Sequence, residues 1–312
     1  MSRIVIALGG NALGNNPEEQ KELVKVPAKK IAELVKAGHQ VVVGHGNGPQ
    51  VGMIFNGFAS AHEVNEKSPL VPLPEAGAMS QGYIGYHMVN AITNAFIDEG
   101  LAEQEVMYIL TQTLVDGADP AFQNPTKPIG PFYTTKEEAE AMNPNSVIKE
   151  DAGRGYRKVV ASPKPINFVG INQIKKSIEA GATVIVGGGG GIPTVTCPKK
   201  GHISGVDGVI DKDFALAKLA SLTNADYFVV LTAVDNVMVN YKQPNQKALT
   251  HATKAELEEY IKQNQFAPGS MLPKVQAAIK FVEEGGKAAF IGDLKDLENI
   301  INGKTGTKVT LN

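Results

Sequence analysis

Three apolar stretches of this chain each run directly into a glycine-rich loop, a combination that can bind anions. Runs of β-branched residues bounded by glycine are typical of strands buried on both faces. At the carboxyl ends of parallel strands, glycine lets backbone N–H groups approach an anion closely and surround it. One such loop is equally typical of a tight turn between strand and helix, but three together favour a binding site for a small, highly charged ligand. The stretches are residues 4–14, 41–52 and 183–193.

Three lysines stand where a phosphate group would explain their position. Lys212 and Lys274 each fall in the first turn of an expected helix, the second helix following Ser270 as a candidate N-cap. A lysine there opposes the helix dipole, whereas a phosphate bound by the helix N–H groups and the lysine would offset that cost. Lys127 lies in a stiff, proline-rich segment, and Asp213 would orient the lysines rather than approach a phosphate itself. Each lysine alone is also compatible with an ordinary solvated side chain.

The common signatures of other enzyme classes are missing. Residues 298–305 resemble a phosphate-binding loop only at their end, because Glu298 occupies the place of its first glycine. Gly44, Gly46 and Gly48 have the wrong spacing for a dinucleotide loop, and no serine hydrolase elbow occurs. The histidines lack metal-ligand spacing, so we expect no metal held chiefly by the protein. His45 is a candidate substrate contact, with a loop-stabilising hydrogen bond as the alternative.

Composition predicts a cytoplasmic α/β protein. The 312 residues suit one large domain or two lobes, and the net charge of -2 gives no indication of nucleic acid or membrane partners. The single cysteine, Cys197, excludes an intramolecular disulfide. We expect no signal peptide and no membrane-spanning segment, because the chain begins with a strand and has no apolar run of about 20 residues.

Strand and helix patterns alternate along the chain, which predicts a parallel sheet with crossover helices. The segment from Asp116 to Pro165 interrupts this alternation, since it is rich in proline and glycine and too irregular for a sheet interior. We interpret it as a small excursion from the main sheet. After a helical stripe that stops at Gly38, the pattern predicts strands at 105–110, 227–232, 288–291 and 308–311, and helices at 76–99, 171–179, 211–221 and 271–284.

Ten strings of this sequence together resemble the carbamate kinase branch of the amino acid kinase family. The resemblance covers essentially the whole chain, and the strings 124–131 and 149–157 are those that separate this branch from its relatives. Two small departures occur: the run around Gly188–Gly191 is one glycine longer than expected, and Ala233 stands at a variable place. The ten strings are residues 7–12, 45–52, 80–86, 124–131, 149–157, 161–165, 187–193, 209–213, 231–235 and 266–274.

The resemblance implies a three-layer αβα sandwich with an open, mostly parallel eight-stranded sheet, in a chain that forms a homodimer. It implies one domain over 1–312 with two lobes: 1–210 would bind carbamate and include a protruding subdomain at about 116–165, and 211–312 would bind the nucleotide. The implied reaction is ATP + carbamate ⇌ ADP + carbamoyl phosphate, with Mg²⁺ held mainly by the phosphates. The family's usual role is to make ATP from carbamoyl phosphate in arginine breakdown, the arginine deiminase pathway.

The resemblance also assigns roles to particular residues. The catalytic residues would be Lys127, Lys212, Asp213 and Lys274. Carbamate and the transferred phosphoryl group would be bound by Gly9, Gly10, Asn11, Gly46, Asn47, Gly188, Gly189 and Gly190. ATP would be bound by Thr232, Ala233, Asp235, Tyr241, Pro268, Gly269 and Met271. Another member of the family, acting on acetylglutamate, glutamate, aspartate or a nucleoside monophosphate, is the alternative. A dinucleotide-dependent dehydrogenase or a non-catalytic nucleotide sensor fits less well.

Overall fold

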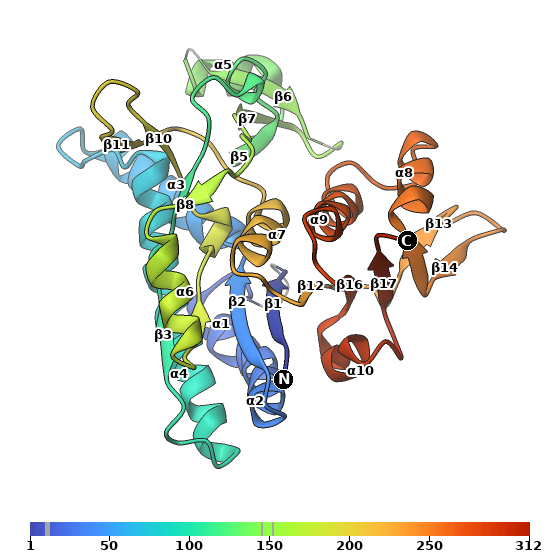
Figure 1. The fold of residues 1–312 in the computed structure, drawn as a ribbon. Helices are drawn as coiled ribbons and strands as arrows, with labels where there is room; N and C mark the ends of the chain where they lie inside the picture. The colour runs from blue at the N-terminus through green and yellow to red at the C-terminus, as the bar shows by residue number, and fades with distance from the viewer. Residues whose placement is uncertain (10–12, 145, 152) are drawn as a thin grey trace.

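An eight-stranded sheet forms the centre of the computed structural model, which describes residues 1–9, 13–144, 146–151 and 153–312 (Figure 1). Its strands lie in the order β15-β17-β16-β12-β1-β2-β9-β3. The strands from β16 to β3 are parallel, and β17 is antiparallel to β16, so the prediction of an open, mostly parallel sheet is confirmed. The bounds are Arg3–Leu8 (β1), Gln40–His45 (β2), Val106–Tyr108 (β3), Thr183–Ile185 (β9), Tyr227–Thr232 (β12), His251–Thr253 (β15), Ala288–Asp293 (β16) and Thr307–Thr310 (β17).

Helices cover both faces of this sheet, which confirms the three-layer architecture. Successive residues of β1 point to opposite faces, so Val5 and Ala7 belong to one hydrophobic core while Ile4 and Ile6 belong to the other. The first core is closed by α6 (Ile171–Glu179), α7 (Lys212–Leu222), α8 (Lys254–Lys262) and α9 (Met271–Glu283), and the second by α2 (Lys25–Lys36), α4 (Leu73–Asp98) and α10 (Leu297–Ile301). Two further helices are α1 (Pro17–Leu23) and α3 (Gly48–Val64).

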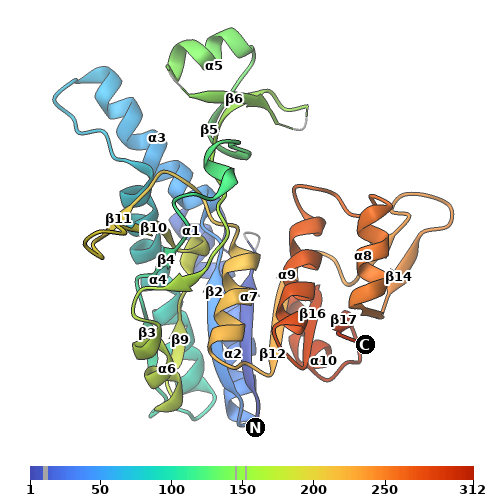
Figure 2. The same ribbon diagram turned by 45° about the horizontal axis from the view of Figure 1, so that its top comes forward.

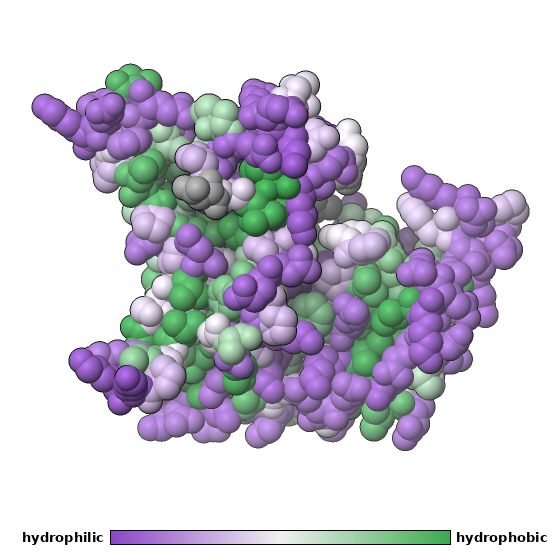
Figure 3. All heavy atoms as spheres, turned by 90° about the horizontal axis from the view of Figure 1, so that it is seen from above, coloured by the Kyte–Doolittle hydropathy of each residue, from purple (hydrophilic) through white to green (hydrophobic). Residues whose placement is uncertain are grey.

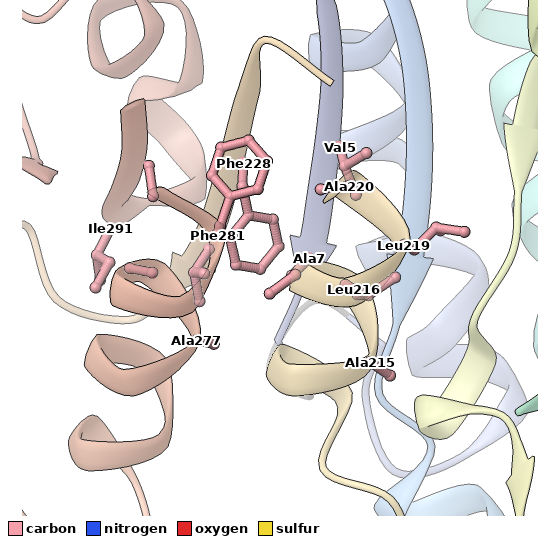
Figure 4. Packing of buried hydrophobic residues seen from close by; sticks show 14 of the residues in the cluster. Val5, Ala7, Ala215, Leu216, Leu219, Ala220, Phe228, Ala277, Phe281 and Ile291 are labelled. Atoms are coloured by element: carbon pink, nitrogen blue, oxygen red, sulfur yellow. The ribbon is translucent and has the colours of Figure 1, made fainter. Parts of the chain in front are cut away.

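The contact between α7 and α9 is the part of the core that matters most for the site. Phe228 of β12 and Phe281 of α9 pack with ring centroids 5.8 Å apart and ring planes tilted by 56°, and Leu216 of α7 lies close to Ala7 of β1 (Figure 4). All four side chains are buried. This packing fixes the amino-terminal ends of α7 and α9 next to each other, beside the carboxyl ends of the central strands.

We expect Gly44→Ala to destabilise the protein by about 1–3 kcal/mol through overpacking. A Cβ at Gly44 would lie 2.1 Å from Cδ2 of Leu216, and that leucine is fully buried and has no space to move into. Urea unfolding measures the loss. Gly57→Ala in α3 is the control, because its Cβ would meet nothing within 4 Å and alanine favours a helix. Equal stability of the two variants would contradict this account.

The segment 116–165 contains a small subdomain that projects from the main body (Figure 2). Its proline-rich part was predicted to be too irregular for a sheet interior, yet Lys127–Tyr133 forms a strand, β5. The prolines are tolerated because β5 is an edge strand whose register with β7 shifts between Ile129 and Tyr133. The subdomain comprises η2 (Pro120–Phe122), β5 (Lys127–Tyr133), α5 (Lys136–Met142), β6 (Val147–Glu150) and β7 (Tyr156–Val160).

Several smaller elements were not predicted. A four-stranded sheet has the order β11-β10-β4-β8 and a hairpin joins β13 and β14. Their strands are short, two to five residues, which is why the sequence pattern did not indicate them. The bounds are Gln112–Leu114 (β4), Asn167–Phe168 (β8), Ile192–Thr196 (β10), Ile203–Gly205 (β11), Val237–Val239 (β13) and Lys247–Leu249 (β14), with the 3-10 turns Gly188–Gly190 (η3) and Leu294–Asp296 (η4).

Most predicted elements occur within a few residues of their expected bounds. The strand expected at 105–110 is shorter, and the helix expected at 76–99 begins three residues earlier, at Leu73, with Pro74 in its first turn. In the part of the chain that the structure describes, no helix is long and apolar enough to cross a membrane.

Candidate active site

The three glycine loops meet at one edge of the sheet. They follow β1, β2 and β9, which are adjacent parallel strands, with β12 on the other side of β1. Gly9 follows β1, Asn47 precedes α3, and the third loop forms the turn η3. Gly10 and Asn11 lie outside the described residues. The carboxyl edge of the sheet is the expected ligand-binding edge of such a fold.

The third loop needs glycine for packing as well as for backbone conformation. Gly189 has φ +65°, and a Cβ there would lie 2.2 Å from Nδ2 of Asn47, whose amide donates a hydrogen bond to Ser80 Oγ at 2.9 Å. Gly190 has φ +87°, and its Cβ would lie 2.3 Å from the carbonyl oxygen of Ile210. The loop is therefore packed between the second glycine loop and the start of α7.

Only some of the predicted backbone donors are available in this arrangement. The N–H of Gly46 donates to Leu8 O, and the N–H of Gly190 donates to Gly187 O. Among contacts between described residues, no acceptor faces the N–H groups of Gly188 and Gly189. In this loop, the backbone N–H groups that remain to bind an anion are therefore those of Gly188 and Gly189, next to the Asn47 amide.

Asp213 joins two of the predicted catalytic lysines. Its side chain is buried, with one oxygen accepting from Lys212 Nζ and the other from Lys274 Nζ at 2.9 Å. Burial by itself raises the pKa of Asp213, but the two ammonium groups bring that pKa below its usual value. Burial lowers the pKa of Lys212, and the Asp213 carboxylate opposes this effect. The packing of α7 on α9 brings these residues together from positions about sixty residues apart in the chain.

Lys127 reaches the same place from the subdomain. Its Nζ lies 3.0 Å from Oδ2 of Asp211, the N-cap residue of α7. The structure therefore gathers all four predicted catalytic residues, and it adds Asp211 to them. The N-cap expected at Ser270 is at the cap position of α9, but its side chain makes no capping hydrogen bond.

A cavity of about 510 Å³ opens beside this cluster and is the candidate phosphate end of a nucleotide site. Four predicted residues line it with Lys212: Gly9, Thr232, Ala233 and Lys274. The lining also includes residues that sequence reasoning missed, from the end of β16 and the turn after it, and from α1 and α2. Ligands bind at the carboxyl ends of parallel strands, and β16 lies next to β12. This rule could have indicated the residues at the end of β16. The missed residues are Asp293, Leu294 and Lys295, with Leu23 and Val26.

The remaining predicted nucleotide residues do not line this cavity. Asp235 and Tyr241 are exposed near the β13–β14 hairpin, and Lys242 Nζ lies 5.5 Å from the centroid of the Tyr241 ring. Pro268 and Gly269 are exposed just before α9, and Met271 is half-buried against the core. Their role toward adenosine stays a prediction.

His45 is the last residue of β2 and lies against Gly188 of the third loop. It is fully buried; its Nδ1 donates to the carbonyl oxygen of Gly46 at 2.7 Å, and its Nε2 accepts from the hydroxyl of Tyr108 at 3.0 Å. Burial lowers the pKa of His45 to about 4. Of the two alternatives for this residue, the geometry favours the loop-stabilising hydrogen bond.

Acid should therefore destabilise the protein through His45. Its pKa is lower in the folded state than the ordinary value of 6.5, so the unfolded state binds the extra proton as the pH falls from about 6.5 to 4. We expect a loss of about 2–3 kcal/mol between pH 7 and pH 4.5 from this residue. Urea unfolding of wild type and His45→Gln at both pH values measures it: the variant should lose less stability. Equal losses would contradict the assignment.

Metal binding by side chains alone finds no support in the described ranges. They contain no group of three or more histidine, cysteine, aspartate or glutamate side chains arranged to hold a metal ion. Both oxygens of Asp213 already bind lysines.

The fold and this site define a phosphotransferase-like arrangement, and the chain belongs to the amino acid kinase family: the family's sequence profile matches residues 2–293. A carbamate kinase-like protein of Mycoplasma pneumoniae is 57% identical over 310 residues, which is 99% of each chain. A carbamate kinase of Clostridium perfringens is 49% identical over 98% of this chain and 99% of its own. Carbamate kinase from Giardia lamblia bound to AMP-PNP matches with a TM-score of 0.91 and 44% identity, over 99% of this chain and 98% of that one.

Proposed function

We propose that this protein is a carbamate kinase that catalyses ATP + carbamate ⇌ ADP + carbamoyl phosphate. The observation that carries the proposal is the pair of half-buried lysines on the buried Asp213, placed beside glycine loops at the carboxyl edge of the sheet. In the forward direction a carbamate oxygen attacks the γ-phosphorus, and the bond to the β,γ-bridging oxygen breaks to release ADP. Carbamate is already an anion, so the reaction needs no general base.

Phosphoryl transfer then depends on positioning and on neutralising charge. Lys212 and Lys274 supply positive charge next to the cavity, and the N–H groups of Gly188 and Gly189 are donors for the transferred group. Lys127 approaches from the subdomain side. Mg²⁺ would enter as the nucleotide complex and be held mainly by the phosphates and water.

The space at the glycine loops favours a small acceptor. A cavity of about 30 Å³ lies against Asn47, Gly188 and Gly189, bounded on its other sides by α4 and β10. One small planar group fits there, whereas the side chain of acetylglutamate or a nucleoside would need a larger space. This observation favours carbamate over the other acceptors of the family.

We also propose the finer assignments implied by the family. Residues 1–210 bind carbamate and 211–312 bind the nucleotide. This division is supported by the cavity that Lys212 and Lys274 line together with Gly9, after β1, and Thr232, at the end of β12. The protein works as a cytoplasmic homodimer in arginine breakdown. The dimer proposal is supported by β3, an edge strand with Met107 exposed, and by Tyr86 and Ile97 exposed on the neighbouring α4. Sedimentation of the purified protein tests it.

An acceptor panel tests the substrate. Purified protein with MgATP is offered ammonium bicarbonate as a source of carbamate, and separately acetylglutamate, glutamate, aspartate or a nucleoside monophosphate, and ADP release is followed. We expect ADP only with carbamate. Faster ADP release with any other acceptor would replace carbamate by that acceptor, and reduction of a nicotinamide dinucleotide by any substrate would move the protein to another class.

A further inference from the structure

We propose that Asp211 is a positioning residue that holds Lys127, and with it the protruding subdomain, over the phosphoryl-transfer site. The proposal rests on the proposed function for its effect on turnover. Asp211 acts through the lysine that it binds.

The two carboxylate oxygens of Asp211 have different partners. Oδ1 accepts from the backbone N–H of Asp213 at 2.9 Å and so caps α7. Oδ2 accepts from Nζ of Lys127 at 3.0 Å. One side chain therefore connects the first turn of α7, where Lys212 and Asp213 stand, with a lysine 84 positions earlier in the chain.

This ion pair is a distinct link between the subdomain and the body. Among ion pairs of the described residues, it is the one that joins residues 116–165 to the rest of the chain; the others of that segment are internal to it. A backbone bond supports it nearby, since Val209 N–H donates to the carbonyl oxygen of Ala161. The segment 208–211, just before α7, thus supports the base of the subdomain.

Part of the boundary is hollow, although α3 also contacts β5. A cavity of about 230 Å³ separates the subdomain from the segment after α3. In the view from above, hydrophobic side chains appear among hydrophilic ones over the centre and left of the surface (Figure 3). A subdomain with a gap on one side needs a tie on the other if it is to keep one orientation. The gap is lined by Phe55, Leu70, Val71, Pro72, Leu73, Ile129, Lys158, Val160 and Asp207.

Lys127 particularly depends on such a tie. Its side chain is 37% exposed and has four rotatable carbon bonds, so without a partner it would sample many positions in water. The Asp211 side chain is only 17% exposed and is fixed by its role as a cap. A lysine held by a fixed carboxylate beside the first turn of α7 is ordered before the phosphate arrives.

Asp211→Asn separates the two roles of the residue, because asparagine is as good an N-cap as aspartate but carries no charge. We expect kcat for ATP formation to fall by about 10- to 100-fold, with little change in the KM for MgADP. In a Lys127→Ala background the same substitution should have no further effect. Hydrogen exchange in the free protein should become faster over residues 127–160 and stay unchanged over α7. Asp116→Asn, near the base of the subdomain, is the control, since its carboxylate accepts from Ala118 N.

The outcomes separate this proposal from the proposed function. Wild type that makes no ATP would refute the function, while the exchange result would still report whether Asp211 holds the subdomain. An equal loss of activity in the presence and absence of Lys127, unchanged exchange over 127–160, or a rise in kcat on Asp211→Asn would each overturn the positioning role. A rise in kcat would mean that Asp211 withholds Lys127 from the phosphate.

Discussion

Lys212→Ala should lower kcat by about 10²–10³, while the KM for MgADP changes far less. The expectation follows from the position of Lys212 in the first turn of α7, with its side chain 15% exposed and hydrogen-bonded to Asp213 at the wall of the 510 Å³ cavity. A charge fixed there acts on the developing transition state more than on the bound nucleotide. Steady-state rates of ATP formation at varied MgADP measure both parameters.

Lys218→Ala is the matched control on the same helix. Lys218 Nζ lies 3.2 Å from a carboxylate oxygen of Glu284, and this ion pair does not line the 510 Å³ cavity. Loss of the Lys218 side chain should therefore leave kcat unchanged. If Lys212→Ala raised the KM with kcat intact, Lys212 would serve nucleotide binding alone and its transition-state role would be wrong.

Asp213→Asn should lower both activity and stability. Asparagine keeps the shape but leaves two ammonium groups facing each other without a counter-charge, a loss of about 3 kcal/mol in the free energy of unfolding. Of the influences on the pKa of Lys212, burial and the neighbouring Lys274 lower it, and Asp213 is the chief one that raises it. Without Asp213, Lys212 loses its proton at a lower pH, and the neutral amine cannot neutralise phosphate charge. The alkaline limb of the kcat profile should therefore move to lower pH.

A pH series of kcat and urea unfolding at neutral pH measure these two effects. Asp226→Asn is the control, because Asp226 pairs with Lys287 outside the site and its loss should not change kcat. An alkaline limb that stays in place in Asp213→Asn would show that Asp213 does not maintain the charge of Lys212.

The central strands of the main sheet could be predicted because β1, β2, β12 and β16 are largely apolar runs of six residues. The strand at 227–232 and the helix at 171–179 have the expected bounds, and the three glycine loops follow adjacent strands. The order of strands in the sheet is a different matter: β9 lies between β2 and β3 although it comes much later in the chain. Only pairing in three dimensions decides that order, and no local pattern carries it.

In the site, too, some features follow from a local sequence pattern and others depend on packing in three dimensions. Lys212 and Lys274 were recognisable by their unfavourable place in a first turn, but their common partner depends on how α7 packs on α9. The Lys127–Asp211 pair depends on how the subdomain sits, which no local pattern indicates. Likewise, Gly46 and Gly190 were expected to be donors because they are glycines, whereas their N–H groups are used inside the fold. Glycine spacing predicts a loop, but hydrogen-bond partners decide which N–H groups remain for a ligand.

ATP formation from carbamoyl phosphate and MgADP by the purified protein tests the central claim most directly. We predict that wild type and Lys218→Ala form ATP at equal rates and that Lys212→Ala forms it at least about a hundredfold more slowly. Wild type that forms no more ATP than Lys212→Ala would contradict the assignment of this site to phosphoryl transfer from carbamoyl phosphate.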